Sequence, residues 1–265
     1  MTNIVVLIKQ VPDTWSERKL TDGDYTLDRE AADAVLDEIN ERAVEEALQI
    51  REKEAADGVE GSVTVLTAGP GRANEAIRKA LSMGADKAVH LVDDALEGSD
   101  ALATSLALAT VLQRTGFDLV ILGSESTDAR TGLLAAMLAE RAGCAQLSLA
   151  SKVEVDGNAI TIHRQADYGY DKVEATLPAV VSVVEKINEP RYPSFKGIMA
   201  AKKKPVEVLS VADAGIDPAQ VGLGAAATGV VSFSKRPPRE AGTIVKDEGD
   251  GGVKAAEFLA AQKFI

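Results

Sequence analysis

One stretch of the sequence combines hydroxyls, a basic side chain and free backbone amides in a way that could bind an anion. It reads Gly-Ser-Glu-Ser-Thr-Asp-Ala-Arg-Thr-Gly over residues 123–132 and lies between an apolar run and a helical pattern. A helix N-terminus carries partial positive charge and unpaired N–H groups, which favour a phosphate there. In the alternative interpretation, Thr131 or Asp128 caps the helix by accepting hydrogen bonds from its first amides. The residues alone leave both interpretations open.

A second turn, at residues 69–74, also follows a predicted strand and opens a predicted helix. It reads Gly-Pro-Gly-Arg-Ala-Asn. Glycines in this position let the backbone approach a pyrophosphate, although Asn74 replaces the third glycine, and a tight strand–helix turn is the alternative. Ligands of open α/β sheets lie beyond the carboxyl ends of the strands. We therefore expect the segments after Ile8, Ala68 and Leu122 to converge on one site.

The scarcity of reactive side chains limits the other chemistry that the chain can perform. Its 265 residues include one Cys and two His. Cys144 alone cannot form an internal disulfide or a thiolate cluster. Two His residues are too few for a His-rich metal site, and His90, in the middle of an apolar run, is expected to be a packed core residue. We predict neither a catalytic residue nor a bound metal ion.

Charge and hydropathy exclude further classes of partner. The net charge is −12, from 29 Lys+Arg and 41 Asp+Glu. An acidic chain is a poor ligand for nucleic acid, because that binding depends on Lys and Arg neutralising phosphates. No apolar run approaches the roughly 18–20 residues that cross a bilayer, and the start of the chain lacks the basic front of a signal peptide. These patterns predict a cytoplasmic chain without membrane insertion or nucleic-acid binding.

The elements that must position these turns alternate between strands and helices. Continuous apolar runs predict strands that are buried on both faces, and apolar residues three and four apart predict amphipathic helices between them. The predicted strands are 4–8, 62–68, 88–92 and 119–123, and the predicted helices are 36–50, 73–83, 100–115 and 131–142. This order predicts an α/β fold, a doubly wound and mostly parallel sheet with helices on both faces.

Other segments interrupt or follow this pattern. Residues 20–27 predict a hairpin around Asp22-Gly23, and residues 152–163 predict an antiparallel hairpin extension, which a β-rich segment follows. We assign residues 1–190 to the α/β domain. Residues 188–204 are loop-like, and residues 205–265 have too few apolar residues for a core of their own. This last segment, with a short strand and a terminal helix, is predicted to be an extended arm that is mobile or lies on a partner.

Several short motifs, in order along the chain, resemble the β subunit of electron transfer flavoprotein. The most specific is NEPRY at 188–192 followed by IMAAKKK at 198–204, and the others are AVEEA at 43–47, GP at 69–70, ALSMGAD at 80–86 and LPAVV at 177–181. The resemblance implies a heterodimer in which an α subunit holds most of the FAD site. It also implies that this chain buries an AMP and has no bond-breaking catalysis of its own.

The resemblance implies AMP contacts at the strand ends where the residues themselves predict a ligand. They fall at the end of the first strand, at the turn that residues 37–40 form, at the residue before Gly-Pro and along the 123–131 loop. The implied residues are Leu7, Lys9, Asp37, Asn40, Ala68, Gly123, Ser124, Ser126, Thr127, Asp128, Arg130 and Thr131.

The resemblance also implies a docking surface for other flavoenzymes. Residues 188–204 correspond to a partner recognition loop whose apolar anchor is Phe195, accompanied by Tyr192, Ile198 and Met199. One exposed bulky side chain can fill a pocket and dominate an interface. The expected partners are acyl-CoA dehydrogenases of fatty acid β-oxidation, which donate electrons, and a quinone-linked oxidoreductase, which accepts them. Residues 205–265 are expected to pack on the α subunit.

Two other functions remain open. In bifurcating or nitrogen-fixation-type relatives, a second FAD replaces AMP in the β subunit. In a different class, the chain would be a stand-alone adenine-nucleotide-binding module of the stress-protein type, which needs no α subunit to fold.

Overall fold

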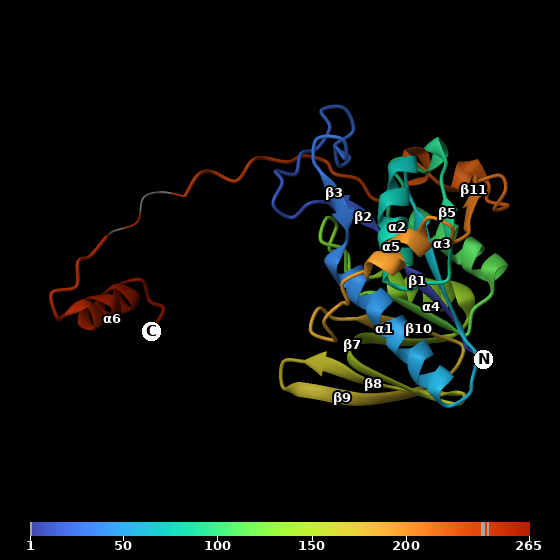
Figure 1. The fold of residues 1–265 in the computed structure, drawn as a ribbon. Helices are drawn as coiled ribbons and strands as arrows, with labels where there is room; N and C mark the ends of the chain where they lie inside the picture. Colours follow the sequence, from blue (N-terminus) through green and yellow to red (C-terminus); the bar gives the residue numbers. More distant parts are fainter. Residues whose placement is uncertain (1, 240–241, 243) are drawn as a thin grey trace. The chain divides into compact units, whose positions relative to one another are not determined.

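The computed structural model describes residues 2–239, 242 and 244–265. They form a large compact unit that ends at Val230 and a small unit that comprises 231–265. The small unit contains helix α6 (Gly251–Ala261) (Figure 1).

A nine-stranded sheet forms the centre of the large unit, in the order β11-β5-β4-β1-β6-β10-β7-β8-β9. All neighbours from β11 to β7 are parallel, and β8 and β9 continue the sheet as antiparallel strands. The predicted α/β fold, with its antiparallel extension, is confirmed. The strands are β1 (Asn3–Leu7), β4 (Ser62–Ala68), β5 (Lys87–Leu91), β6 (Leu119–Gly123), β7 (Ala145–Asp156), β8 (Ala159–Ala166), β9 (Gly169–Thr176), β10 (Ala179–Val183) and β11 (Val206–Leu209).

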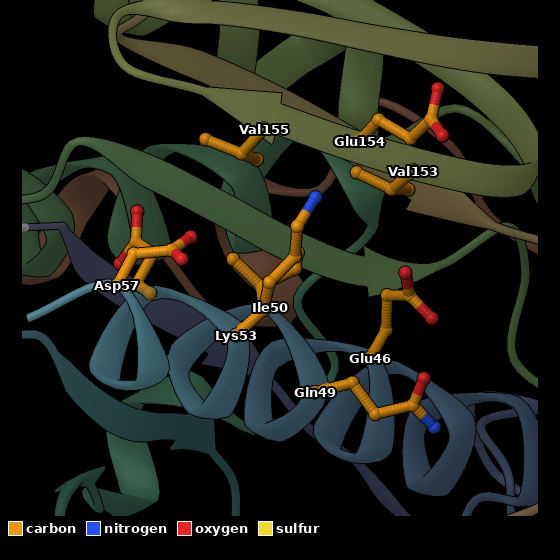
Figure 2. Close-up of a pocket in the computed structure, with 9 residues that line it drawn as sticks. Glu46, Gln49, Ile50, Lys53, Asp57, Val153, Glu154 and Val155 are labelled. Atoms are coloured by element: carbon orange, nitrogen blue, oxygen red, sulfur yellow. The ribbon is translucent and has the colours of Figure 1, made fainter. Parts of the chain in front are cut away.

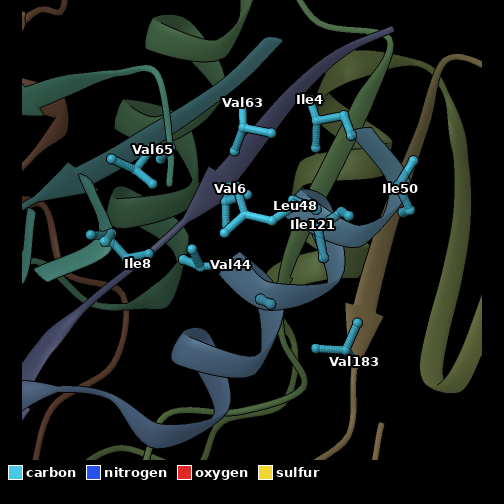
Figure 3. Close-up of a cluster of buried hydrophobic side chains, with 14 of the residues drawn as sticks. Ile4, Val6, Ile8, Val44, Leu48, Ile50, Val63, Val65, Ile121 and Val183 are labelled. Carbon is cyan, nitrogen blue, oxygen red and sulfur yellow. The ribbon is translucent and has the colours of Figure 1, made fainter. Parts of the chain in front are cut away.

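Helices cover both faces of this sheet because successive strand side chains point in opposite directions. Ile4 and Val6 of β1 pack in one core with α1 and α2 (Figure 3). Val5 and Leu7 pack in the other core with α3 and α4. The helices are α1 (Glu38–Ala56), α2 (Asn74–Met83), α3 (Ala101–Thr115), α4 (Leu134–Ala142) and α5 (Phe195–Ala201).

Shorter elements complete the large unit. Strands β2 (Gln10–Pro12) and β3 (Ala34–Leu36) form a separate antiparallel pair. The loop between them contains the predicted hairpin, in which Leu20 bridges Leu27. The 3₁₀ helices are η1 (Gly71–Ala73), η2 (Asp94–Leu96), η3 (Pro218–Gln220) and η4 (Leu223–Ala225).

The assignment of residues 205–265 to one arm needs correction. Strand β11 pairs with β5 at the edge of the sheet, and Val211, Ala214, Ile216 and Val221 are buried in the core beside α3. These few apolar residues need no core of their own, because they complete an existing one. Residues 206–230 therefore belong to the large unit. Within the rest of the predicted arm, residues 240, 241 and 243 lie outside the described residues.

Asp100 fixes the last part of the large unit to the start of α3. Its Oδ1 accepts a hydrogen bond from the Ala103 amide at 3.0 Å. Its Oδ2 accepts from the Ala227 and Thr228 amides and from the Thr228 hydroxyl, each at 3.0 Å. Burial raises the pKa of this carboxyl, but the hydrogen bonds outweigh burial and the net pKa is lowered.

We expect Asp100→Ala to lower the free energy of unfolding by about 1 kcal/mol, the usual cost of losing a helix cap. Asp100→Asn is the control, since its amide oxygen can still cap the helix. Urea denaturation at neutral pH measures both variants. An Asp100→Ala variant as stable as the unsubstituted chain would show that the cap and the Ala227–Thr228 contacts contribute nothing.

Candidate functional site

The strand order creates a ligand-binding position between β1 and β6. Successive connections run from β1 to β4 and β5 on one side, and the chain then returns to β6 on the other side of β1. Ligands of open α/β sheets bind at such a reversal, beyond the carboxyl ends of the strands. Lys9 follows β1 here, and residues 124–131 follow β6.

Asp37 connects the start of α1 to the loop that follows β6. This fully buried carboxylate caps α1, with its Oδ1 accepting from the Ile39 amide at 3.0 Å and the Asn40 amide at 3.1 Å. Its Oδ2 accepts from the Thr127 amide at 2.8 Å. One side chain thus fixes the helix N-terminus and the loop relative to each other.

Asp128 is the charged centre of this site. Its side chain is 1% exposed and accepts from Lys9 Nζ at 2.8 Å and from Arg29 at 3.3 Å. The Ser126 hydroxyl donates to it at 2.6 Å. Burial raises the pKa of the carboxyl, but Lys9, Ser126 and Arg29 outweigh burial, so the net pKa lies below the ordinary value.

Gly123 allows α1 to lie directly against the end of β6. A Cβ atom on Gly123 would lie 2.5 Å from Asn40 Nδ2 and 3.0 Å from Ile39 Cγ2. Real Cβ atoms essentially never lie within 3.0 Å of another heavy atom. A side chain at residue 123 would therefore force the Asn40 side chain in the first turn of α1 to move.

The remaining predicted residues surround this cluster at different depths. Leu7 is buried in the core, and Ala68 is half-buried at the end of β4. The Ser124 amide donates to the Val183 carbonyl at 2.8 Å, which holds the loop to β10. Arg130 and Thr131 are exposed. The structure thus brings together Lys9, Asp37, Asn40, Gly123, Ser126, Thr127 and Asp128, and the Arg130 amide donates to the Ser126 carbonyl at 2.9 Å.

The alternative in which this loop caps α4 is wrong for both candidate residues. Helix α4 begins at Leu134 rather than at Thr131, and its N-cap residue, Leu133, makes no side-chain cap bond. Asp128 binds Lys9 and Arg29 instead of the helix amides. Ser126 and Asp128 are therefore directed to the strand-end site rather than to the start of α4.

The chemistry of this cluster fits a phosphorylated ligand that also carries hydroxyl groups. Lys9 and Arg29 are cationic and about one third exposed. The buried Thr127 Oγ1 has no hydrogen-bond partner within the described part of the chain. A buried hydroxyl without a partner is costly, and a ligand group could satisfy it. Phosphate oxygens would suit the two cations, and a sugar hydroxyl would suit Thr127.

Arg29 was not predicted from the sequence. It lies in the loop between β2 and β3, 99 residues before Asp128, and no periodicity or motif distinguishes it from other surface arginines. Arg72 of the Gly-Pro turn donates to the Arg29 carbonyl and forms an ion pair with Glu30 at 3.3 Å. Arg72 and Glu30 also line a polar cavity of about 580 Å³ next to this loop.

A second cavity, of about 210 Å³, lies between the later turns of α1 and strand β7 (Figure 2). Glu46, Lys53 and Glu154 line it, together with Val153. It lies along the later part of α1, away from the Asp37 cap, and is therefore no part of the strand-end site.

The second glycine-rich turn, at residues 69–74, contacts a buried residue of the neighbouring strand β5. His90 of β5 is 3% exposed, and its Nε2 lies 3.1 Å from the Gly69 carbonyl oxygen. Burial lowers the pKa of the imidazole. The prediction that His90 is a packed core residue is confirmed, and its contact supports the tight-turn interpretation of residues 69–74.

Residues 188–204 present a cluster of exposed apolar side chains, and we call this range the docking segment. Tyr192 is 97% exposed and Phe195 80%, whereas Ile198 and Met199 are about half-exposed. The segment is not entirely loop-like as predicted, because α5 occupies Phe195–Ala201. Seven helical residues between loop-like flanks are too few for a clear periodic signal.

Comparison with known proteins identifies similar chains over the full length. A family model described as "Electron transfer flavoprotein domain" matches residues 24–214. The chain is 65% identical over 266 residues to "Electron transfer flavoprotein subunit beta" of Mycobacterium tuberculosis, and 64% identical to that of Mycobacterium leprae, covering 100% of both chains each time. It is 36% identical to "Caffeyl-CoA reductase-Etf complex subunit CarD" of Acetobacterium woodii, covering 90% of this chain and 89% of the relative.

The helices add one finding about membranes. Across residues 2–239, 242 and 244–265, none combines the length and apolar character required to cross a bilayer.

Proposed function

The chain belongs to the family of electron transfer flavoprotein β subunits, and from that premise we propose that it transfers electrons as one half of a heterodimer. In this proposal, acyl-CoA dehydrogenase-type flavoenzymes supply the electrons and a quinone-linked oxidoreductase receives them. The full-length similarity to proteins named as β subunits supports the need for an α subunit. It favours this function over a stand-alone nucleotide-binding module.

We propose that the strand-end site of this chain binds AMP. Lys9 and Arg29 would bind the phosphate, and Thr127 would form a hydrogen bond with a hydroxyl group of the nucleotide. The N-cap of α1 at Asp37 and the close approach at Gly123 would hold the surrounding backbone in place. The observation that carries this proposal is the buried Thr127 hydroxyl, which has no hydrogen-bond partner among the described residues, beside two partly exposed cations.

FAD, held mainly by the α subunit, would supply the redox chemistry by accepting and releasing electrons. This chain would contribute binding surfaces and no bond-breaking catalysis. We propose that residues 231–265 pack on the α subunit, which is supported by exposed apolar side chains on and beside α6: Val253, Phe258, Leu259, Phe264 and Ile265. The docking segment would bind the electron donors through Phe195.

Nucleotide content tests the proposal directly. We expect the heterodimer, purified after co-expression with its α subunit, to release one FAD and one AMP when it is denatured. Chromatography of the supernatant identifies and counts both nucleotides. Substitution of Thr127 by Val should lower the AMP content and leave FAD unchanged, because this change removes the hydroxyl at nearly constant volume.

Other outcomes would assign a different function. Two FAD and no AMP would indicate the bifurcating or nitrogen-fixation type of electron transfer flavoprotein. A chain that is folded and monomeric or homodimeric without an α subunit, and that contains an adenine nucleotide, would indicate the stand-alone module.

A further inference from the structure

The first half of the docking segment is fixed to α1 by one arginine. The Arg191 guanidinium donates to both carboxylate oxygens of Glu45, with Nε–Oε2 2.8 Å and Nη2–Oε1 3.0 Å. It also donates to both oxygens of Glu52, at 2.5 and 3.1 Å. The backbone amide of Arg191 donates to Glu45 Oε2 at 3.1 Å. We call these three residues the arginine clamp.

The geometry of the clamp is specific to arginine. A planar guanidinium can bind two carboxylates through two different edges, whereas a lysine ammonium is a point charge. Glu52 and then Glu45 raise the pKa of the Arg191 guanidinium. Burial raises the pKa of Glu45, but its bonds to Arg191 and Gln49 outweigh burial and lower the net pKa. The clamp is therefore fully charged at neutral pH.

A neighbouring contact strengthens the attachment to α1. Asn188 donates from Nδ2 to the Arg42 carbonyl at 3.1 Å and to Glu46 Oε2 at 3.0 Å, while the Arg42 side chain donates to the Asn188 carbonyl. The side chain of Glu45 is 5% exposed. The side chains of Arg191 and Glu52 are 33% and 49% exposed, so the clamp acts through the number and direction of its hydrogen bonds rather than through burial. Its directional bonds fix the conformation of the chain beside it.

The second half of the docking segment is fixed to α2. A Cβ atom on Gly197 would lie 2.5 Å from the Ser82 carbonyl oxygen, so α5 packs directly against the last turn of α2. Arg78 donates to the Ala201 carbonyl at 2.7 Å. Lys204 donates from Nζ to the Leu81 carbonyl at 3.0 Å and to the Ala85 carbonyl. Tyr192 and Phe195 lie between these two attachments and are largely exposed.

We propose that Arg191, with Glu45 and Glu52, is a positioning residue that holds the docking segment in the conformation that presents Phe195 to partner dehydrogenases. This inference rests on the docking role proposed above. Binding is tighter when a surface is already ordered, because less conformational entropy is lost on association. The clamp orders the residue directly before Tyr192, and the contacts with α2 order the residues after Phe195.

Kinetics with the dehydrogenase as electron donor test this role in the co-expressed heterodimer. We expect Arg191→Ala to raise the apparent KM for the heterodimer about tenfold, equivalent to about 1.4 kcal/mol, and to leave kcat, FAD content and reduction by dithionite unchanged. Arg191→Lys should give an intermediate KM, since one ammonium cannot bind both carboxylates bidentately. Arg114→Ala is the matched control, because Arg114 is in the last turn of α3, which covers the opposite face of the sheet from α1 and α2, and pairs there with Glu207 and the Asp213 carbonyl.

Hydrogen exchange gives a readout that does not depend on the dehydrogenase. We expect the Gly197 and Ile198 amides, which donate to the Ser194 hydroxyl and carbonyl, to exchange about tenfold faster in Arg191→Ala, because opening would cost about 1.4 kcal/mol less. Unchanged exchange would overturn the proposal. Glu52→Gln, which weakens only the more exposed half of the clamp, gives the same test if Arg191→Ala does not assemble.

Comparison with Phe195→Ala separates the two possible failures. If Phe195→Ala raises KM and Arg191→Ala does not, docking stands and the positioning role is wrong. If neither variant raises KM, the docking role fails, and the positioning role fails with it. A raised KM in both, with faster exchange only in Arg191→Ala, supports the proposal.

Discussion

Replacing Asp128 by Asn is expected to lower the free energy of unfolding by about 2 kcal/mol at pH 7. Removing one partner of a fully buried ion pair costs roughly 3–5 kcal/mol, and the cost is smaller here because Lys9 and Arg29 are each about one third exposed. An Asn amide leaves these two cations without an anion between them. Urea denaturation of the heterodimer at neutral pH measures the difference.

The pH dependence of the free energy of unfolding tests independently whether the Asp128 carboxylate causes this loss of stability. The folded pKa of Asp128 lies below its ordinary value, so the folded state favours the carboxylate. The resulting stability is fully present above the unfolded pKa of about 3.9 and is lost as pH falls through the lower folded pKa. The difference in the free energy of unfolding between the unsubstituted protein and Asp128→Asn should therefore decrease only at acidic pH.

Asp118→Asn is the matched control for charge removal. The Asp118 carboxylate accepts from the Asn3 amide at 2.8 Å, a bond that an Asn oxygen can also accept. We expect this variant to change the free energy of unfolding by less than about 0.5 kcal/mol, as for ordinary surface substitutions. If Asp128→Asn were equally mild, the ion pairs with Lys9 and Arg29 would not stabilise the site.

The arrangement of the sheet could be predicted because the sequence patterns that indicate its strands and helices are local. Four apolar runs correspond to β1, β4, β5 and β6. Helix ends were predicted where glycine adopts positive φ, as at Gly84, Gly116 and Gly143. Helix α1 extends to Ala56, whereas the prediction ended at residue 50. The prediction followed the apolar pattern, and the last turns of α1 are mostly polar. Arg51 holds part of this region through an ion pair with Asp86 at 3.0 Å.

Contacts between distant segments could not be predicted in this way. Val211 and Ile216 belong to the core of the large unit, but nothing nearby in the sequence indicates which surface covers them. Arg29 joins the strand-end site across 99 residues, and Arg191 reaches Glu45 across 146. A single sequence gives residue type and spacing, whereas these contacts depend on how loops fold back over the sheet.

At the strand-end site, the position could be predicted from the sequence, but the side-chain contacts could not. Converging strand ends predicted the position of the site from the topology, and the structure places Lys9, Asp37 and Asp128 there. The alternative in which Thr131 or Asp128 caps the helix is wrong, because the turn continues to Leu133 before α4 begins. The location of a site thus follows from the fold class, whereas the pairing within it depends on loop conformation.

Replacing Phe195 by Ala is expected to raise the apparent KM of the dehydrogenase for the heterodimer about thirtyfold, with unchanged kcat. The Phe195 side chain is 80% exposed on the first turn of α5, and hydrogen bonds to α1 and α2 fix the chain before and after it. Truncating a central aromatic anchor of an interface typically costs at least about 2 kcal/mol. Each factor of ten in affinity corresponds to about 1.4 kcal/mol, which gives the expected ratio.

A matched aromatic control separates docking from general loss of exposed apolar surface. Tyr168, between β8 and β9, is 79% exposed and lies outside the docking segment, so Tyr168→Ala should leave KM unchanged. FAD content and the free energy of unfolding should be the same in both variants, because an exposed ring contributes little to the fold. Loss of FAD from Phe195→Ala would mean that the ring supports the cofactor site. An unchanged rate of electron transfer would mean that dehydrogenases dock elsewhere.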